Sequence, residues 1–257
     1  MDQQQTGGKP KKSKKSKQQG KSNGKRQAER GRSGGTATHF VILLDRSGSM
    51  ESIADDVVGG FNTWLADQQR SGDDAVLTLV QFDSQDAHEV VIDAAPIAGI
   101  RPLGRDRFIP RGATPLLDAT GRVIAMARRR EQERAAHGLP AEGVVVVSIT
   151  DGHENHSREF TVSGIRDLIT ERESAGWTFV FLSAALDVYG EAGALGYRAG
   201  NVQAFRADAL GCDMAFQSLS HASGMVREQH RSGRTDSNLD LWGEEKPAES
   251  DRNSRRS

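Results

Sequence analysis

The chain has 257 residues, which suffices for one sizeable α/β domain with terminal extensions or for two small domains. Its net charge of −1 conceals an asymmetry, because eleven Lys and Arg against two acidic residues give residues 1–36 a charge of +9 and leave −10 for the rest. The single cysteine excludes an intramolecular disulfide, and the sequence shows neither an apolar signal segment nor an apolar run that could span a membrane. We therefore expect a cytoplasmic protein.

Residues 1–36 are mostly Lys, Gln, Ser and Gly. This composition cannot bury enough apolar surface to offset the entropy of ordering, so it predicts a disordered basic arm. Two roles stay open for the arm: a solubilising tail, or a segment that contacts nucleic acid or an acidic partner by charge. No aromatic residue interleaves the lysines, so nucleic-acid contact would be non-specific and salt-sensitive.

Hydrophobic periodicity predicts alternating strands and helices after the arm. In the first half of the chain the predicted elements are a buried strand at 41–44, a helix from Ile53 to about Arg70, hairpin strands at 75–82 and 89–92, and a loop over 93–113. In the second half they are a helix from Pro115 to about Gly138 with Thr114 as N-cap, strands at 143–150 and 177–183, helices at 160–175 and 188–196, a strand at 202–205, and a closing helix at 208–229.

These elements predict an α/β fold with a doubly wound, mostly parallel central sheet, one antiparallel edge strand and helices on both faces. The closing helix is expected to bury Leu210, Met214, Leu219 and Met225. We assign one domain to residues 37–229. Residues 230–257 are polar and are predicted to form a disordered tail.

Three oxygen-bearing side chains follow the first predicted strand, in the stretch Phe40–Met50 (FVILLDRSGSM). Asp45, Ser47 and Ser49 lie where the strand stops and a helix is about to start. In open α/β sheets, ligands bind at this carboxyl end of the strands. One carboxylate and two hydroxyls at a sharp turn favour a hard divalent cation over a soft one.

The D-x-S-G-S pattern resembles the metal-ion-dependent adhesion site of von Willebrand factor type A domains. Two further segments extend the resemblance: Gly112–Leu116 (GATPL) is similar to the family's G-G-T-P-L, and Asp151 follows the strand at 143–150. All three motifs occur in the family's order at predicted element boundaries. With one cysteine and no signal segment, the chain is similar to bacterial intracellular members.

The resemblance implies a magnesium site, with Mn²⁺ as an alternative, in which Ser47, Ser49 and Thr114 offer hydroxyl oxygens and Asp45 and Asp151 hold the ion directly or through water. Neutral ligands would leave the metal electrophilic. It also implies the family's mode of binding, in which a partner protein supplies an Asp or Glu carboxylate to the metal. Because the sequence has no apolar run that could span a membrane, we expect no membrane partner.

Other interpretations of single residues were weighed against this site. His153 and His156 could add softer ligands for Zn²⁺ or Mn²⁺, although solvated loop histidines are more common. Asp45 and Asp151 could each be helix N-caps, the serines turn residues, and Glu51 a contact to a metal-bound water. Glu154 and Asn155 are expected to form hydrogen bonds within their loop.

Enzymatic classes fit the sequence less well. A phosphatase of the haloacid-dehalogenase type would need a second acid at position 47, where this chain has serine. A serine hydrolase would need G-x-S-x-G at the turn after the first strand, where Asp45 occupies the first position, and the nucleotide-binding P-loop pattern is absent from the sequence. We therefore predict a non-enzymatic interaction module, with a scaffold that docks through its basic arm as the alternative and a metal-dependent hydrolase as the least favoured.

Overall fold

The computed structural model describes residues 1–2, 35–234, 239–243 and 246–249. The chain divides into two units, Met1–Gly34 and Gly35–Ser257. The predicted basic arm therefore lies almost entirely outside the described residues. All helices and strands of the described residues belong to the second unit.

Strands and helices alternate along the second unit. The strands are β1 (Ala37–Asp45), β2 (Ala75–Phe82), β3 (Glu89–Pro96), β4 (Glu142–Thr150), β5 (Thr178–Ser183) and β6 (Val202–Ala204). The α-helices are α2 (Ala54–Arg70), α3 (Leu116–Ala136), α4 (Val162–Ser174), α5 (Val188–Ala194) and α6 (Ala209–Arg231). Short 3-10 turns are η1 (Gly48–Ile53), η2 (Ile97–Gly99), η3 (Arg105–Arg107) and η4 (Ala199–Asn201).

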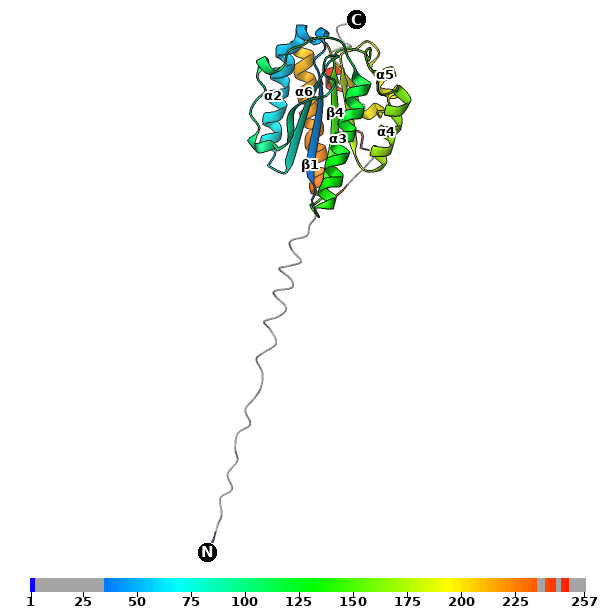
Figure 1. Cartoon of the computed structure of the whole chain (residues 1–257). Coiled ribbons are helices and arrows are strands. Elements are labelled where there is room, and N and C mark those ends of the chain that lie inside the picture. The colour runs from blue at the N-terminus through cyan, green and yellow to red at the C-terminus, as the bar shows by residue number, and fades with distance from the viewer. Residues whose placement is uncertain (3–34, 235–238, 244–245, 250–257) are drawn as a thin grey trace. The chain divides into compact units, whose positions relative to one another are not determined.

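The six strands form one sheet in the order β3-β2-β1-β4-β5-β6. Strand β1 lies in the middle, where Ile42 pairs with Leu79 of β2 and with Val147 of β4, both in parallel. Only the β2–β3 pair is antiparallel, and it lies at one edge. The predicted doubly wound sheet with one antiparallel edge strand is confirmed (Figure 1).

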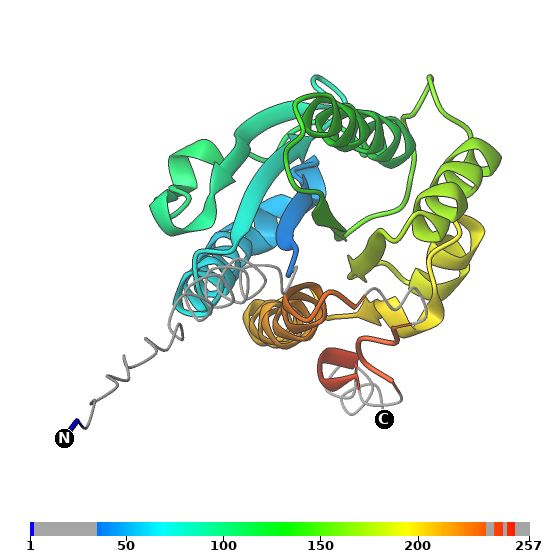
Figure 2. The ribbon, with the colours of Figure 1, turned by 90° about the horizontal axis from the view of Figure 1, so that it is seen from below.

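Alternate residues of β1 enter two separate cores because the strand is covered on both faces. Phe40, Ile42 and Leu44 pack with α2 and α6, whereas Val41 and Leu43 pack with α3 and α4. Figure 2 shows these two helix layers on opposite sides of the sheet. The nearly continuous apolar sequence of β1 follows from this double burial.

Hydrogen bonds join helices α2 and α6, an aromatic contact joins α2 to β1, and an ion pair joins α6 to the turn before β2. The Trp64 ring meets Phe40 edge-on at 5.4 Å, and its indole N–H donates to Ser223 Oγ at 3.0 Å. Arg227 is fully buried and donates to the backbone oxygen of Gln68 at 2.6 Å and to the Asp74 carboxylate. These contacts hold the closing helix against the turn before β2.

Several predicted boundaries need correction. Helix α3 begins at Leu116 instead of Pro115, and no side-chain cap precedes it, so the N-cap role predicted for Thr114 is wrong. Helix α4 begins at Val162 because Thr161 Oγ1 accepts from Gly164 N at 3.2 Å and caps it. Strand β3 runs to Pro96, beyond the predicted end at Ile92, because an edge strand tolerates proline.

The closing helix and the tail also differ from expectation. Leu210 is 42% exposed and Met214 and Met225 are half-buried; the helix buries other side chains, among them Cys212, Phe216 and Leu219. The predicted domain end at residue 229 is wrong, because α6 continues to Arg231. The predicted tail is wrong for residues 239–243 and 246–249, where Leu241, Trp242 and Ala248 are buried in the core.

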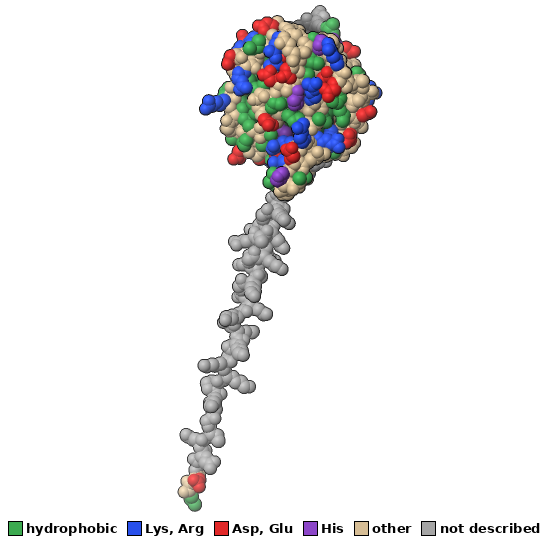
Figure 3. Space-filling view, viewed as in Figure 1, with side chains coloured by type: hydrophobic (Ala, Val, Ile, Leu, Met, Phe, Trp, Pro, Cys, Tyr) green, Lys and Arg blue, Asp and Glu red, His purple; other side chains and the backbone are tan. Residues whose placement is uncertain are grey.

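The described surface mixes charges of both signs. On the face in Figure 3, Lys and Arg side chains are interspersed with Asp and Glu. Exposed pairs such as Arg122–Glu159, at 2.8 Å, contribute to this pattern. None of the helices in the described ranges is long and apolar enough to cross a membrane.

Candidate metal centre

Asp45 ends the central strand β1 with a fully buried carboxylate. Its Oδ1 accepts from the backbone N–H of Ser47 at 2.6 Å, and its Oδ2 accepts from Thr150 Oγ1 at 2.6 Å. Thr150 is the last residue of the neighbouring strand β4. The turn after β1 and the end of β4 therefore hold this carboxylate in one orientation.

The two serines continue from Asp45 toward the surface. Ser47 is buried and Ser49 is exposed, and their hydroxyl oxygens lie 3.2 Å apart. Ser49 Oγ donates to Asp151 Oδ1 at 2.7 Å, which joins the turn after β1 to the turn after β4. The structure thus brings together the carboxylates and serine hydroxyls that the sequence separates by about a hundred residues.

Thr114 faces the same space. Its neighbour Gly112 accepts a hydrogen bond from Gly48 N at 3.0 Å, which fixes this loop beside the two serines. A Cβ placed on Gly152 would lie 3.6 Å from Thr114 Oγ1 and 3.8 Å from Ser49 Oγ. Thr114 is only 2% exposed, so its hydroxyl is held at the inner side of the site.

The loop that carries Asp151 is fastened to the start of α3. Glu154 Oε2 accepts from Leu117 N at 2.9 Å, an amide of the first helical turn that has no partner within the helix. Within its own loop Glu154 Oε1 accepts from His156 N and Ser157 N, and Asn155 Oδ1 accepts from Thr114 N at 2.9 Å. The predicted hydrogen bonds of Glu154 within the loop are confirmed, whereas the Asn155 side chain bonds outside its loop, to the segment before α3.

Asp118 adds a second fastening that sequence reasoning missed. Its carboxylate accepts the backbone N–H groups of Arg158, Glu159 and Phe160, each at 2.9 Å. Burial raises the pKa of Asp118, but these three hydrogen bonds together bring it below its ordinary value. An acidic residue in the first turn of a helix is common, so the sequence held no signal for this contact.

Arg46 is the other residue that the sequence did not single out. It is 4% exposed, its Nε donates to Asp83 Oδ2 at 2.6 Å, and its carbonyl oxygen accepts from Arg111 N at 2.8 Å. Arg111 Nε also donates to Asp83, at 3.0 Å. The cluster ties the β2–β3 turn to two of the three segments of the candidate site. A charged residue directly after a buried strand was the available signal.

The electrostatics of the site favour a cation. Burial is the main cause that raises the pKa of Asp45 to about 7, while hydrogen bonds from Thr150 and Ser47 lower it and the charge of Asp151 raises it again. Burial also raises the pKa of Asp151, against the hydrogen bond from Ser49. Two carboxylates that are both hard to ionise would be stabilised by a positive charge between them.

The donor set fits a hard divalent ion. All five side chains offer oxygen, and among the described residues no group of three or more His, Cys, Asp or Glu side chains could hold a metal. His153 Nδ1 instead lies 3.2 Å from Glu191 Oε2, and the exposed Glu51 pairs with Arg105 at 3.2 Å. The softer site with histidine ligands therefore has no support from these contacts.

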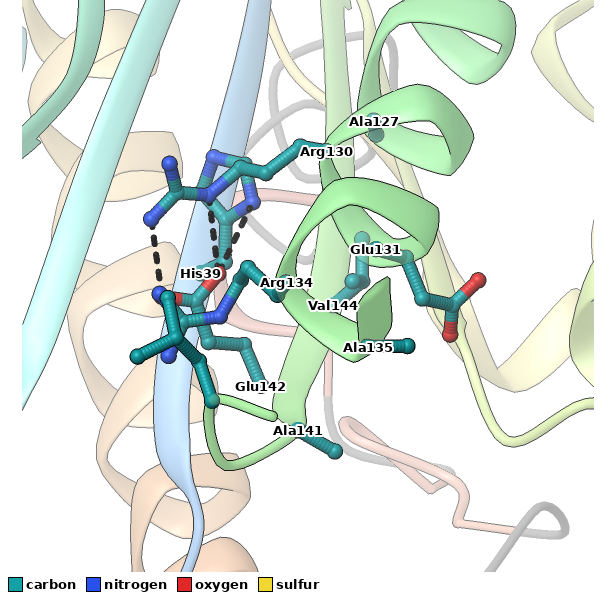
Figure 4. A pocket seen from close by; sticks show the side chains of 10 residues that line it. His39, Ala127, Arg130, Glu131, Arg134, Ala135, Ala141, Glu142 and Val144 are labelled. Atoms are coloured by element: carbon teal, nitrogen blue, oxygen red, sulfur yellow. Dashed lines mark hydrogen bonds and ion pairs between the residues drawn. The ribbon is translucent and has the colours of Figure 1, made fainter. Parts of the chain in front are cut away.

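The opposite end of the sheet carries a closed ionic cluster (Figure 4). A cavity of about 90 Å³ lies between α3 and the start of β4. At its wall, Arg130 donates to both oxygens of Glu142 at 2.9 Å, and Arg134 lies 3.2 Å from the same carboxylate. His39 is buried behind them, with its Nδ1 3.9 Å from Glu142. The two arginines are already paired, so we assign this cluster a role in stability.

Solved structures with a similar fold identify the class of fold. The chain superposes on the pilus adhesin SpaC from Lactobacillus rhamnosus GG in its open conformation with a TM-score of 0.54 and 12% identity, over 72% of this chain and 30% of the adhesin. It superposes on the SpRpn10 VWA domain with a TM-score of 0.50 and 8% identity, over 72% of this chain and 95% of that domain. The chain has the von Willebrand factor type A fold.

Sequence comparisons add nothing to this assignment. No protein-family model matches the chain, and no curated protein matches its sequence. The chain spans less than a third of the length of the adhesin, since the match covers 30% of that protein. The likeness therefore concerns the fold, and the role of the five oxygen donors stays a prediction.

Proposed function

We propose that this chain is a divalent-cation-dependent protein-interaction module, which binds a partner's Asp or Glu carboxylate through a metal at the five predicted residues. One observation carries the proposal: the hydrogen-bonded line from Ser47 through Ser49 to Asp151 lies beside the buried Asp45, at the carboxyl end of the sheet. The shared fold with a protein named as a pilus adhesin supports an interaction role.

The neutral and the charged ligands would have different roles at the metal. Ser47, Ser49 and Thr114 would hold the ion with neutral hydroxyls, and Asp45 and Asp151 would compensate its charge. When bound, Mg²⁺ or Mn²⁺ would supply an electrophilic position for a carboxylate oxygen. Ser49 is exposed and Asp45 is fully buried, so a partner would approach from the side of Ser49.

We further propose that the module acts in the cytoplasm and does not catalyse a reaction. Ser47 stands where a phosphatase of the haloacid-dehalogenase type would need its general acid, and its hydroxyl contacts Ser49 Oγ at 3.2 Å. A serine in this position can hold a cation but is a poor proton donor at neutral pH.

A metal titration tests the site directly. Calorimetry with MgCl₂ and MnCl₂ should give saturable binding to the unchanged chain and at least about tenfold weaker binding to Asp151→Asn, which removes one of two carboxylates. Asp167→Asn, an exposed aspartate of α4, is the matched control and should bind like the unchanged chain. Equal binding by all three proteins would contradict the site.

The capture of a partner needs a second comparison. The chain is immobilised and exposed to cell extract in Mg²⁺, in EDTA, and as the Asp45→Ala variant. A specific partner should be retained only by the unchanged chain in Mg²⁺. Identical recovery in all three conditions would overturn a metal-dependent interaction, whatever the titration shows.

The basic arm motivates a second candidate function, a scaffold that docks on nucleic acid or an acidic partner. The observation in its favour is the charge of +9 within residues 1–36 against −10 in the remainder. Deletion of residues 1–36 should abolish salt-sensitive binding to mixed-sequence DNA or RNA if this role exists. Partner recovery that survives the deletion and ignores salt would leave the arm as a solubilising tail.

A further inference from the structure

The chain returns to the domain after α6. We call residues 239–243 and 246–249 the C-terminal strap. Leu241, Trp242 and Ala248 are 3%, 6% and 0% exposed, and all three belong to the core cluster that contains α2 and α6. Trp242 N donates to Gly200 O at 3.3 Å, and its indole N–H donates to Ser218 O at 3.4 Å. The strap thus bridges α6 and the turn before β6.

The second half of the strap contacts α5. Lys246 Nζ donates to Tyr189 OH at 2.6 Å and to Ala199 O at 2.8 Å, and it lies 4.5 Å from the centre of the Tyr189 ring. Tyr189 OH donates to Glu249 Oε2 at 2.6 Å. One tyrosine therefore joins a cation and a carboxylate of the strap by a charge-assisted chain of hydrogen bonds.

Helix α5 also holds the loop of the candidate metal centre. Glu191 Oε1 accepts from Glu154 N at 2.9 Å, and Glu191 Oε2 lies 3.2 Å from His153 Nδ1. Tyr189 and Glu191 lie on the same seven-residue helix. If the strap leaves Tyr189 and α5 shifts, the hydrogen bond from Glu154 N to Glu191 will therefore weaken, and the loop after Asp151 will become less ordered.

The strap is incompletely packed. A cavity of about 410 Å³ remains beside it, lined by Met214, Gln217, Ser218, His221, Leu241, Trp242 and Pro247. The indole hydrogen bond of Trp242 is long for a buried N–H group. Segments held by few buried contacts open at a small fraction of the global unfolding free energy. These features are typical of a segment that leaves its groove while the domain stays folded.

We propose that the groove between α6 and the η4–β6 turn is a peptide-docking surface whose occupant is the chain's own strap, bound reversibly, and that occupation of the groove stabilises the loop after Asp151 through α5. The determinants of the occupant are adjacent apolar side chains, Leu241 and Trp242, followed by a lysine that reaches Tyr189. The site is separate from the predicted metal ligands.

The first test is competition between the chain's own strap and an added strap peptide. A fluorescent synthetic peptide of residues 235–257 is titrated into the unchanged chain and into full-length Trp242→Ala, whose own strap lacks its main anchor. The peptide should bind the variant at least about tenfold more tightly, because the intact strap leaves only a minor fraction of grooves open. Equal affinities, or no binding to the variant, would overturn the proposal.

Controls keep this comparison interpretable. A peptide carrying Trp242→Ala should not bind either protein, and Leu139→Ala, which removes a half-exposed apolar side chain before β4, should behave like the unchanged chain. Thermal unfolding monitors the fold of each variant. If Trp242→Ala fails to fold, Lys246→Met loosens the strap without opening the core, and the same tightening is required of it.

Hydrogen exchange tests the link to the loop. In EDTA, Trp242→Ala and Tyr189→Phe should each speed the exchange of the Glu154 amide several-fold, since both release α5 from the strap. The amide of Phe160, held by Asp118, is the internal control and should not change. Unchanged exchange at Glu154 in both variants would refute the link. Because neither measurement involves a metal, failure of the metal site would leave these outcomes intact.

Discussion

Protonation of His39 is expected to destabilise the domain. The ring is 2% exposed on β1, with Nε2 2.9 Å from Thr78 Oγ1 of β2. Glu142 of β4 and Arg130 and Arg134 of α3 are the charged groups that face it. Burial is the main cause that lowers the pKa of His39 from 6.5 to about 4; Glu142 raises this pKa, and the two arginines lower it further.

Proton linkage gives the direction and the magnitude of the stability change that His39 causes. The unfolded chain takes up this proton at higher pH than the folded domain does, so the stabilisation is complete above the unfolded pKa of 6.5 and is lost as the pH falls toward 4. Between about pH 7.5 and about pH 5 the loss assigned to His39 is on the order of 2 kcal/mol.

Urea unfolding at both pH values measures this loss. His39→Gln keeps a polar side chain that can bond Thr78 but cannot take up the proton, so its stability should fall by about 2 kcal/mol less between the two pH values than that of the unchanged chain. His137→Gln, at the exposed end of α3, is the matched control. The buried His230, whose pKa burial also lowers, contributes equally to all three proteins. Identical losses in the unchanged chain and His39→Gln would refute the argument.

Two further predictions concern the α2–α6 interface and are measured by urea unfolding. Gly60→Ala should lower the free energy of unfolding by about 1–3 kcal/mol, because the added Cβ would lie 2.2 Å from the Phe216 ring. Gly59→Ala, whose Cβ would have nothing within 4 Å, should raise it by up to about 1 kcal/mol. A higher free energy of unfolding in both variants would contradict this packing. Asp74→Asn should destabilise the domain at neutral pH by leaving the buried Arg227 without its carboxylate. Hydrogen bonds from Arg231 and Arg227 hold the pKa of Asp74 well below its ordinary value of 3.8, so this loss should shrink as the pH falls below 3.8; a loss that is as large at about pH 2 as at about pH 7 would show another cause.

Strands β1 and β4 were predictable because a continuous apolar run is typical of a strand buried on both faces. Nine consecutive residues of β1 are almost all buried, and so are the last seven of β4, since both strands lie inside the sheet with helices on either side. Helix starts were less predictable. Thr114 has the chemistry of a cap, but its amide bonds to Asn155 and the helix begins two residues later, with a distant Glu154 at its first turn.

The composition of residues 230–257 led to the wrong prediction of a disordered tail for the part that is buried. The stretch around Trp242 is polar on average, which predicts a tail. Its few apolar side chains nevertheless find a groove on α6, and no local pattern reveals a groove that exists only after β6 and α6 have packed. Burial of Leu241 and Trp242 was therefore decided by the tertiary structure.

The sequence by itself determined the alternation of strands and helices and the five candidate oxygen donors, because hydrophobic periodicity and short motifs are local properties. Only the tertiary structure decided that Asp45, Ser49 and Asp151 meet, since the adjacency of β1 and β4 in a parallel sheet joins turns that are far apart in the chain. It also decided what surrounds them: a buried Arg46, two carboxylates that fasten loops to α3, and a strap that reaches the site through α5. Those contacts depend on distances between elements, which no local pattern encodes.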